Sequence, residues 1–373
     1  MLRSKYPSTQ AGLCYTKAMP SFLRKTTLPA ALLTATLSTT LAAIPFAAHS
    51  AVAEDHTLKV SPSTVAWGYY WAQAKPALTV HSGDTVTIQT MSTCGPPERL
   101  EKLGVKPSDI PQYERDMYAK DAVTDKGPGG HILTGPVAIE EAEPGDVLEV
   151  RILKVAIDVP FACNSFGAGR GFLPNDFPYS HTKLIPLDRE HMTAQFAPGI
   201  SIPLHPFFGS MGLAPPESVG RYNSAPPWMH GGNMDNKELV AGTTLFIPVN
   251  AKGGLFEAGD GHAGQGNGEV DITAMETFLT GTFQFIVHKD QHQLWPRAET
   301  PTHYISMGFS EDLKTATEMS VRNMIGFLVE QKHLTRDDAY ALTSVACDVD
   351  ITELVDGNVG VHTMCPKVIF TAK

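Results

Sequence analysis

A tight turn followed directly by a β-like run recurs along the sequence. The turns end in Gly-Asp or Gly-Thr, and the runs have the alternation and β-branched content of strands. The turn and run pairs are 82–84 with 85–90, 143–146 with 147–153, and 241–243 with 244–249. Their separations are too irregular for a solenoid. The pattern therefore predicts a mainly β protein whose core is a β-sandwich of the jelly-roll kind.

Helical periodicity is clear only near the C-terminus. Apolar residues recur at helical spacings between Asp312 and Lys332, and Thr335 is a candidate N-cap for a second helix. The segment 349–356 then returns to a strand pattern. We therefore expect a β-rich core over residues 54–300 and a smaller C-terminal α+β part of the same unit over 301–373.

The charge balance argues against a nucleic-acid partner. The chain has 39 acidic and 29 basic side chains, and its formal net charge is -10. The basic residues form no stripe that would follow a phosphate backbone. A hydrophobic fraction of 42% over 373 residues is that of a globular protein with a large core.

The first 53 residues have the pattern of a secretory signal peptide. A charged segment from Met19 to Lys25 precedes the apolar run 28–53, so that translation could begin at Met19, and Ala53 fits a cleavage site. An uncleaved membrane anchor is the alternative, because the run approaches the length of a short span. We expect an exported, periplasmic protein with no stable membrane insertion after processing.

Four cysteines remain once the signal segment and Cys14 are removed. They are Cys94, Cys163, Cys347 and Cys365. Disulfides are common in exported proteins, and we expect Cys347 to pair with Cys365 if their segments form adjacent strands. The surroundings of Cys94 and Cys163 match no nucleophile signature.

The stretch 253–269 is the densest concentration of unusual residues. Seven glycines alternate there with polar side chains, which points to a loop with positive-φ turns or close backbone approaches. The stretch 231–236, just upstream, is similar. The polar residues of interest are Asn233, Asp235, Glu257, Asp260, His262, Gln265 and Glu269.

Several segments, in order along the chain, resemble the acetamidase/formamidase family. They are 76–80 with 82–84, 130–136, 142–146, 231–235, 253–269 and 302–305. The resemblance extends from about Val65 to Lys367. It implies a β-sandwich-like core with an additional α+β part, and hydrolysis of the C–N bond of small amides such as formamide or acetamide. Export departs from the cytoplasmic habit of such amidases, so the physiological amide stays open.

Amide hydrolysis needs an activated nucleophile, a stabiliser for the oxyanion and a proton for the departing ammonia. A divalent metal supplies the first two. The expected ligands lie in the family-like motifs and are His131, Asp235, Asp260 and His262. Zn²⁺ is the expected metal, with Mn²⁺ or Ca²⁺ as alternatives. His131 could instead form hydrogen bonds within its loop, and Asp235 could cap a turn.

Three further side chains are expected at the site. Glu269 is the predicted general base and acid, with Glu257 as the alternative. Gln265 and Asn233 carry amides that could hold the substrate or its oxyanion, or could satisfy loop backbone groups.

One competing motif is set aside, and one alternative function stays open. Gly259 to Gly264 matches G-x-G-x-x-G, but residues 264–268 cannot begin the helix that a dinucleotide site needs. Nucleotide and serine-hydrolase motifs are otherwise absent from the sequence, which favours metal-assisted hydrolysis. A noncatalytic exported ligand-binding protein on a jelly-roll scaffold is the alternative.

Two regions and the assembly complete the predictions. Residues 94–130 are either a lid over the site or a surface insertion, with a weak helix at 112–120, and residues 164–228 could reshape the pocket. We also expect a homo-oligomer.

Overall fold

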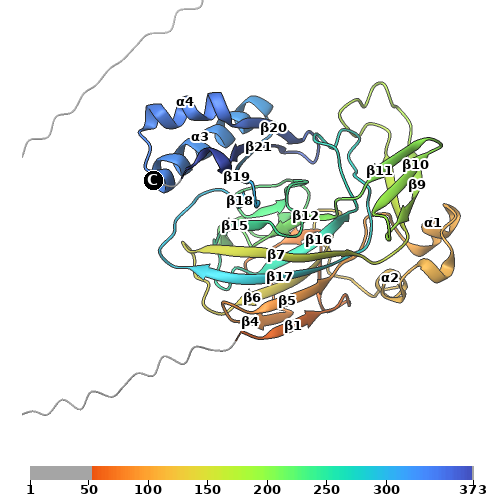
Figure 1. Cartoon of the computed structure of the whole chain (residues 1–373). Coiled ribbons are helices and arrows are strands. Elements are labelled where there is room, and N and C mark those ends of the chain that lie inside the picture. The colour runs from red at the N-terminus through yellow and green to blue at the C-terminus, as the bar shows by residue number, and fades with distance from the viewer. Residues whose placement is uncertain (1–52, 372–373) are drawn as a thin grey trace, which may run out of the picture. The chain divides into compact units, whose positions relative to one another are not determined.

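The computed structural model of the chain describes residues 53–371 (Figure 1). The predictions of a signal peptide and of a start at Met19 concern residues outside this range. The described residues belong to one compact unit with several β-sheets and few helices. None of the helices within 53–371 combines the length and the apolar composition that a membrane span requires.

The largest sheet has nine strands in the order β1-β5-β17-β7-β15-β18-β19-β21-β20. All three turn-fed runs predicted from the sequence are strands of this sheet, namely β5, β7 and β15, so that prediction is confirmed. The bounds are β1 (Asp55–Leu58), β5 (Thr85–Gln89), β7 (Val147–Ile157), β15 (Thr244–Pro248), β17 (Leu279–His288), β18 (Arg297–Glu299), β19 (His303–Ser310), β20 (Asp348–Glu353) and β21 (Val359–Pro366).

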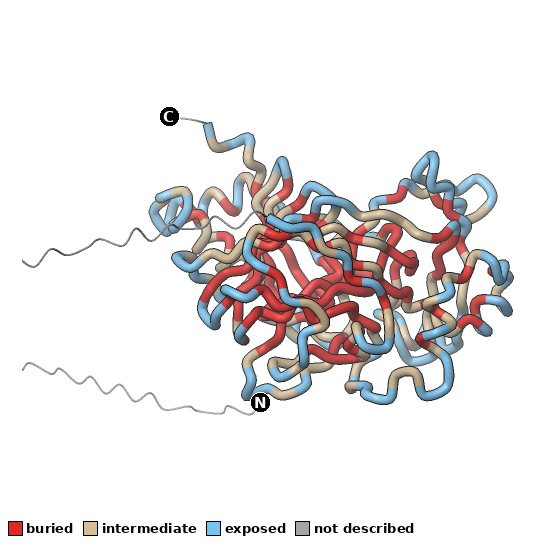
Figure 2. Tube along the Cα trace, turned by 90° about the horizontal axis from the view of Figure 1, so that it is seen from below, coloured by how far each residue is buried: buried red, intermediate tan, exposed pale blue. Residues whose placement is uncertain are grey.

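A six-stranded sheet packs against the first part of the large one. Its strands are β2 (Val65–Trp67), β4 (Leu78–Val80), β6 (Ile132–Ile139), β12 (Phe207–Gly212), β14 (Gly231–Asn233) and β16 (Phe256–His262). The two sheets share one apolar core: Phe256 of β16 packs on Phe283 and Phe285 of β17, with ring centroids 5.5 Å and 5.0 Å apart. Figure 2 shows this buried centre in red. Two facing sheets with a common core confirm the predicted β-sandwich.

Two smaller sheets and short helices lie beside the sandwich. The four-stranded sheet contains β8 (Phe161–Phe166), β9 (His181–Asp188), β10 (Thr193–Ala197) and β11 (Ile200–Pro203), and the two-stranded sheet pairs β3 (Tyr69–Tyr70) with β13 (Tyr222–Asn223). The segment 94–130 forms α1 (Pro97–Lys102), η1 (Pro107–Asp109) and α2 (Gln112–Tyr118), which confirms the weak helix expected there. A further single turn, η2 (Glu217–Val219), precedes β13.

The C-terminal part contains the two predicted helices, α3 (Leu313–Lys332) and α4 (Arg336–Ala346), and ends in η3 (Lys367–Ile369). Asp312 caps α3 by accepting a hydrogen bond from the Thr315 N–H at 2.8 Å, and Thr335 caps α4 in the same way. The strands of this part extend the nine-stranded sheet, and α3 lies over β19 and β21 (Figure 1). Any side chain at Gly308 would meet the backbone of α3, so glycine allows this close packing.

The glycine-rich stretch is only partly a loop, which corrects the sequence-based expectation. Residues 256–262 form the fully buried strand β16. A Cβ atom at Gly259 would lie 2.8 Å from the Ile132 carbonyl oxygen, and one at Gly261 would lie 2.7 Å from Leu279. The glycines of β16 thus allow neighbouring strands to approach closely, and this tertiary packing overrides the low strand propensity of glycine.

The cysteines also correct an expectation. Cys94 is bonded to Cys163, whereas Cys347 and Cys365 are free. The strands that follow Cys347 and contain Cys365 are antiparallel neighbours, as the prediction required. However, Cys347 lies at the C-terminal cap of α4, and its Sγ is 4.0 Å from the Leu342 carbonyl oxygen of that helix.

Candidate active site

Three predicted ligands converge above Gly209 of β12. Asp235 follows β14, whereas Asp260 and His262 belong to β16, and all three are buried. A Cβ atom at position 209 would lie 2.6 Å from Asp260 Oδ2 and 2.9 Å from His262 Cε1, and closer still to Asp235 Oδ1. Only glycine at this position leaves room for the three side chains to meet.

The orientation of the His262 ring is set by Gln265. His262 Nδ1 lies 3.0 Å from Gln265 Oε1, and Gln265 Nε2 donates to the Asp235 carbonyl oxygen at 2.7 Å. Because Gln265 Oε1 can only accept, Nδ1 carries the proton in this arrangement. His262 Nε2 is 3.3 Å from Asp260 Oδ2 and has no hydrogen bond of good geometry. This geometry leaves Nε2 available to a ligand such as a metal ion, with the ring held in place by a hydrogen bond on the other nitrogen.

Glu269 and His131 complete the predicted set. One ligand atom each of Asp235, His262 and Glu269 lie within 4.8 Å of one another, and Glu269 Oε2 has no hydrogen-bond partner. His131 Nε2 is 3.8 Å from Asp260 Oδ2, while its Nδ1 faces the hydroxyl and carbonyl of Ser224. His131 therefore contacts Ser224 through Nδ1 and faces Asp260 through Nε2, and its role as a metal ligand stays a prediction.

Burial and mutual repulsion dominate the electrostatics of the carboxylates. Burial raises the pKa of Asp235 well above its usual range, and the neighbouring Asp260 raises it further. Burial also raises the pKa of Glu269 well above its usual range, and the charge of Asp235 raises it further. For Asp260, burial alone would raise the pKa, but His262 and His131 lower it below its ordinary value. The negative charges also raise the pKa of His262 against the effect of burial, and this same field would attract a metal cation.

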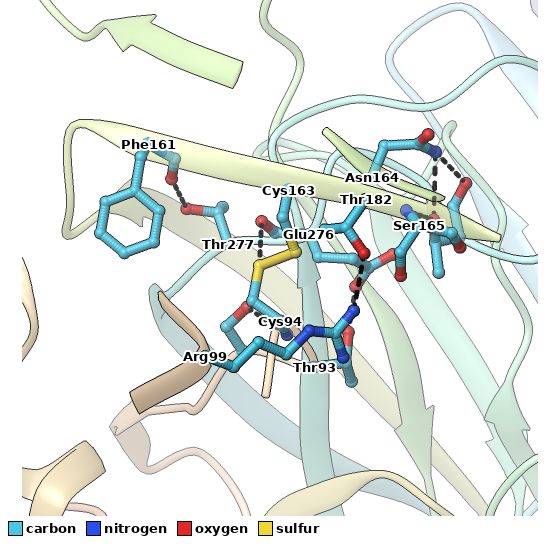
Figure 3. The surroundings of a disulfide bond; sticks show 12 residues. Thr93, Cys94, Arg99, Phe161, Cys163, Asn164, Ser165, Thr182, Glu276 and Thr277 are labelled. Atoms are coloured by element: carbon cyan, nitrogen blue, oxygen red, sulfur yellow. Dashed lines mark hydrogen bonds between the residues drawn. A yellow bond between two sulfur atoms is a disulfide. The ribbon is translucent and has the colours of Figure 1, made fainter. Parts of the chain in front are cut away.

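Sequence reasoning missed Glu276, which lies against His262 beside the disulfide (Figure 3). Its Oε1 is 3.4 Å from His262 Nε2 and accepts from the Ala274 N–H, and its Oε2 accepts from Thr93 Oγ at 2.5 Å. The backbone of Glu276 exchanges both hydrogen bonds with Cys163, at 2.8 Å and 2.9 Å. The disulfide therefore restrains the segment that carries the Glu276 carboxylate. No glycines surround Glu276 in the sequence, so it lacked the signal that marked the other site residues.

The C-terminal part supplies two more carboxylates that sequence reasoning missed, Glu353 and Asp356. Asn233 Nδ2 donates to Asp235 Oδ2 at 2.6 Å and to Asp356 Oδ2 at 3.0 Å, while Asn233 Oδ1 accepts from Ser210 Oγ. The glycine-rich stretch reaches the same place, since Gly268 exchanges backbone hydrogen bonds with the segment around Glu353. The available signal was the Asp-Gly pair 356–357 in the turn between β20 and β21.

Four of the site carboxylates have left-handed backbone. The φ values are 45° at Asp235, 56° at Asp260, 40° at Glu269 and 63° at Asp356. This conformation is uncommon for residues other than glycine, and such strain concentrates at functional sites. Its repeated occurrence around one cluster supports a functional role for the cluster.

A cavity of about 700 Å³ reaches the edge of the site. Gln265 and Glu269 line it together with apolar residues that include Phe196, Ile202 and Met275. Several lining residues come from the region 164–228, as expected, whereas residues 94–130, all of them described, contribute none to the lining of this cavity. Its volume is in the usual range for small-molecule pockets and exceeds what formamide requires.

The predicted site residues are thus largely brought together. The oxygen and the nitrogen of each side-chain amide, Gln265 and Asn233, already form hydrogen bonds with other protein groups. Substrate binding by either residue stays a prediction. Glu257 is buried on β16, and its Oε2 has no hydrogen-bond partner.

The comparisons with known proteins all lead to one enzyme family. Residues 76–224 and 217–372 match the Acetamidase/Formamidase family. The chain is similar to an acetamidase of Mycolicibacterium smegmatis, with 25% identity over 202 residues, and to a formamidase of Methylophilus methylotrophus, with 28% identity over 193 residues. Each alignment covers 38% of this chain, and 49% and 47% of the two relatives, so the chain spans about half the length of the curated relatives it matches.

A solved structure matches a larger share of this chain than the curated relatives do. The crystal structure of a predicted acetamidase/formamidase from Thermoanaerobacter tengcongensis has a TM-score of 0.72 and 25% sequence identity. The match covers 85% of this chain and 97% of that one.

Proposed function

Since the chain belongs to the acetamidase/formamidase family, we propose that it hydrolyses the C–N bond of short linear amides, with water activated by a bound divalent metal. The products are a carboxylate and ammonia. The observation that carries the metal part is the convergence of Asp235, Asp260 and His262 above Gly209, with His262 Nε2 lacking a hydrogen-bond partner.

These residues fit a metal such as Zn²⁺. Buried carboxylate oxygen and imidazole nitrogen are its usual ligands, and Asp235 Oδ1 is also without a hydrogen-bond partner. When bound, the metal lowers the pKa of water and polarises the amide carbonyl. Gln265 keeps the His262 ring in the orientation and protonation state that ligation needs.

Glu269 is the proposed proton carrier. Its carboxyl group is buried, and its unpaired Oε2 lies in the same cluster as Asp235 and His262. Burial and the charge of Asp235 raise the pKa of this carboxyl, which suits a group that takes the proton of the attacking water and returns it to the leaving nitrogen. The cavity that Glu269 lines gives the substrate access.

Ammonia release from a panel of linear amides tests the proposal. We expect release from formamide, acetamide or a longer homologue, loss of activity after metal removal by a chelator, and recovery with Zn²⁺. Full activity in a preparation shown to be free of metal would refute the metal-activated water. Absence of release from every amide would instead favour the noncatalytic binding protein.

The variant Glu269→Gln tests the proton carrier. We expect it to keep its metal content and to lose turnover by about 10²- to 10⁴-fold. Glu238→Gln is the matched control, because Glu238 lines the same cavity and its side chain makes no hydrogen bond within the described residues. Equal activities of the two variants would refute the role of Glu269.

We also propose that the protein is exported. The Cys94–Cys163 disulfide supports this, because such bonds persist mainly in oxidising compartments. Cell fractionation with a C-terminal tag tests it, and accumulation in the cytoplasm would contradict it.

A further inference from the structure

A second cluster of carboxylates adjoins the proposed metal site. Asp235, Glu353 and Asp356 each offer an oxygen, and the three oxygens lie within 4.8 Å of one another. The residues come from separate places in the chain, after β14, at the end of β20 and in the turn that follows β20. All the ligand atoms are oxygens, in contrast to the neighbouring site, which contains the His262 imidazole.

We propose that Asp235, Glu353 and Asp356 bind a second, hard divalent cation of the Ca²⁺ class. Oxygen-only ligand sets favour hard cations, whereas imidazole nitrogen favours Zn²⁺. The inference rests on the proposed function in one respect, that Asp235 is shared with the catalytic metal site.

Unpaired oxygens point to a ligand in this cluster. Glu353 has no exposed surface, and its Oε1 has no hydrogen-bond partner among residues 53–371. Asp235 is 1% exposed, and its Oδ1 is likewise unpaired. A buried carboxylate without a partner is unfavourable unless it is protonated or coordinates a cation. Since Asp235 Oδ1 faces the first site, Glu353 is the buried carboxylate here that needs a cation, and one of its oxygens lies within 4.8 Å of oxygens of Asp235 and Asp356.

The two oxygens of Asp235 belong to different surroundings. Oδ1 lies over Gly209 on the same side as Asp260 Oδ2. Oδ2 accepts from Asn233 Nδ2, the atom that also donates to Asp356 Oδ2. Asn233 therefore holds the carboxylates of Asp235 and Asp356 next to each other, and Asp235 stands between the two sites, where a bridging carboxylate would stand.

Charge balance gives a further argument. Six carboxylates and two imidazoles gather here, and one divalent cation would leave an excess of negative charge in a buried region even with both imidazoles protonated. Arg170, whose charge acts on Asp356, forms no ion pair with the cluster among the described residues. The carboxylates are Asp235, Asp260, Glu269, Glu276, Glu353 and Asp356, and the imidazoles are His131 and His262.

Metal counting on the purified chain tests the inference. After dialysis against buffer containing both Zn²⁺ and Ca²⁺, and then against metal-free buffer, we expect one zinc and one calcium per chain by mass spectrometry. Glu353→Gln should lose the calcium and keep the zinc, and Asp356→Asn should do the same. His262→Ala should lose the zinc and keep the calcium. Asp348→Asn, an exposed position on β20, is the matched control and should keep both.

The outcomes separate this inference from the proposed function. Zinc without calcium, or two zinc ions per chain, would overturn the hard-cation site and leave the proposed function standing. Calcium without zinc would leave the hard-cation site standing and would overturn the zinc site of the proposed function. Added Ca²⁺ should also raise the thermal midpoint of the unaltered chain and not that of Glu353→Gln. Equal shifts in both would overturn the assignment even if a variant folds poorly.

Discussion

Replacing Gly209 with alanine should disable the site by adding one methyl group. The new Cβ would lie 2.6 Å from Asp260 Oδ2 and 2.9 Å from His262 Cε1, and closer to Asp235 Oδ1. Real Cβ contacts essentially never fall below 3.0 Å, so Asp260 must move by at least about 0.4 Å (3.0 minus 2.6 Å) and Asp235 by more.

The displacement of Asp235 exceeds what a metal site tolerates, and that of Asp260 comes close to the limit. Ligand sets must be held within about 0.5 Å of their productive geometry. A misplacement of about 1 Å can cost about 10²-fold in rate. We therefore expect Gly209→Ala to lose metal and at least about 100-fold in kcat, with about 1–3 kcal/mol less stability from overpacking. The backbone also resists relaxation, because the Gly209 carbonyl oxygen accepts from the N–H groups of Met234 and Asp235.

The assay combines ammonia release, metal content and urea unfolding. Gly266→Ala is the matched control, since it lies in the same glycine-rich stretch, has no positive φ, and a Cβ there would meet nothing within 4 Å. We expect the control to retain activity and metal. Wild-type activity and metal content in Gly209→Ala would refute the steric account of the site.

Three further predictions concern parts of the molecule around the site. Glu276→Gln should reduce metal affinity or activity about 10- to 100-fold, because it removes the charge 3.4 Å from His262 Nε2, and a metal titration measures this. Replacing Cys94 and Cys163 together with alanine should lower the unfolding free energy by about 4 kcal/mol in urea, because the disulfide closes a loop with a sequence separation of 69. Burial raises the pKa of Glu114 to about 9, so the folded chain holds a proton that the unfolded chain releases above its ordinary pKa. The contribution of Glu114 to the unfolding free energy should therefore fall as pH rises from about 4.5 to about 9, by up to about 1.4 kcal/mol per pH unit, and Glu114→Gln should remove this contribution from the slope measured in urea titrations.

Each of these predictions has a contradicting result. Unchanged metal affinity in Glu276→Gln would make that carboxylate a bystander. A reducing agent should destabilise the wild type and not the double cysteine variant, and equal effects would contradict the role of the disulfide. Identical pH slopes for wild type and Glu114→Gln would mean that Glu114 is not protonated in the folded chain.

Local patterns in the sequence were sufficient for much of the fold. Turn-fed alternating runs predicted β5, β7 and β15, because side-chain alternation and turn chemistry are properties of neighbouring residues. The apolar spacing that begins at Asp312 and the N-cap candidate Thr335 located the starts of α3 and α4 for the same reason. Local propensity failed for β16, where glycines occupy a buried strand that only close contact with β6 and β17 explains.

The sequence by itself marked Asp235, Asp260, His262 and Glu269, because glycines surround these polar residues within two short stretches. The tertiary structure alone decided that Gly209, Glu276, Glu353 and Asp356 join them, and that Cys94 pairs with Cys163. These residues are far apart along the chain, and they meet because two sheets pack face to face and the C-terminal strands fold back onto the glycine-rich stretch. Contacts of that range follow from the packing of whole sheets, which no local pattern encodes.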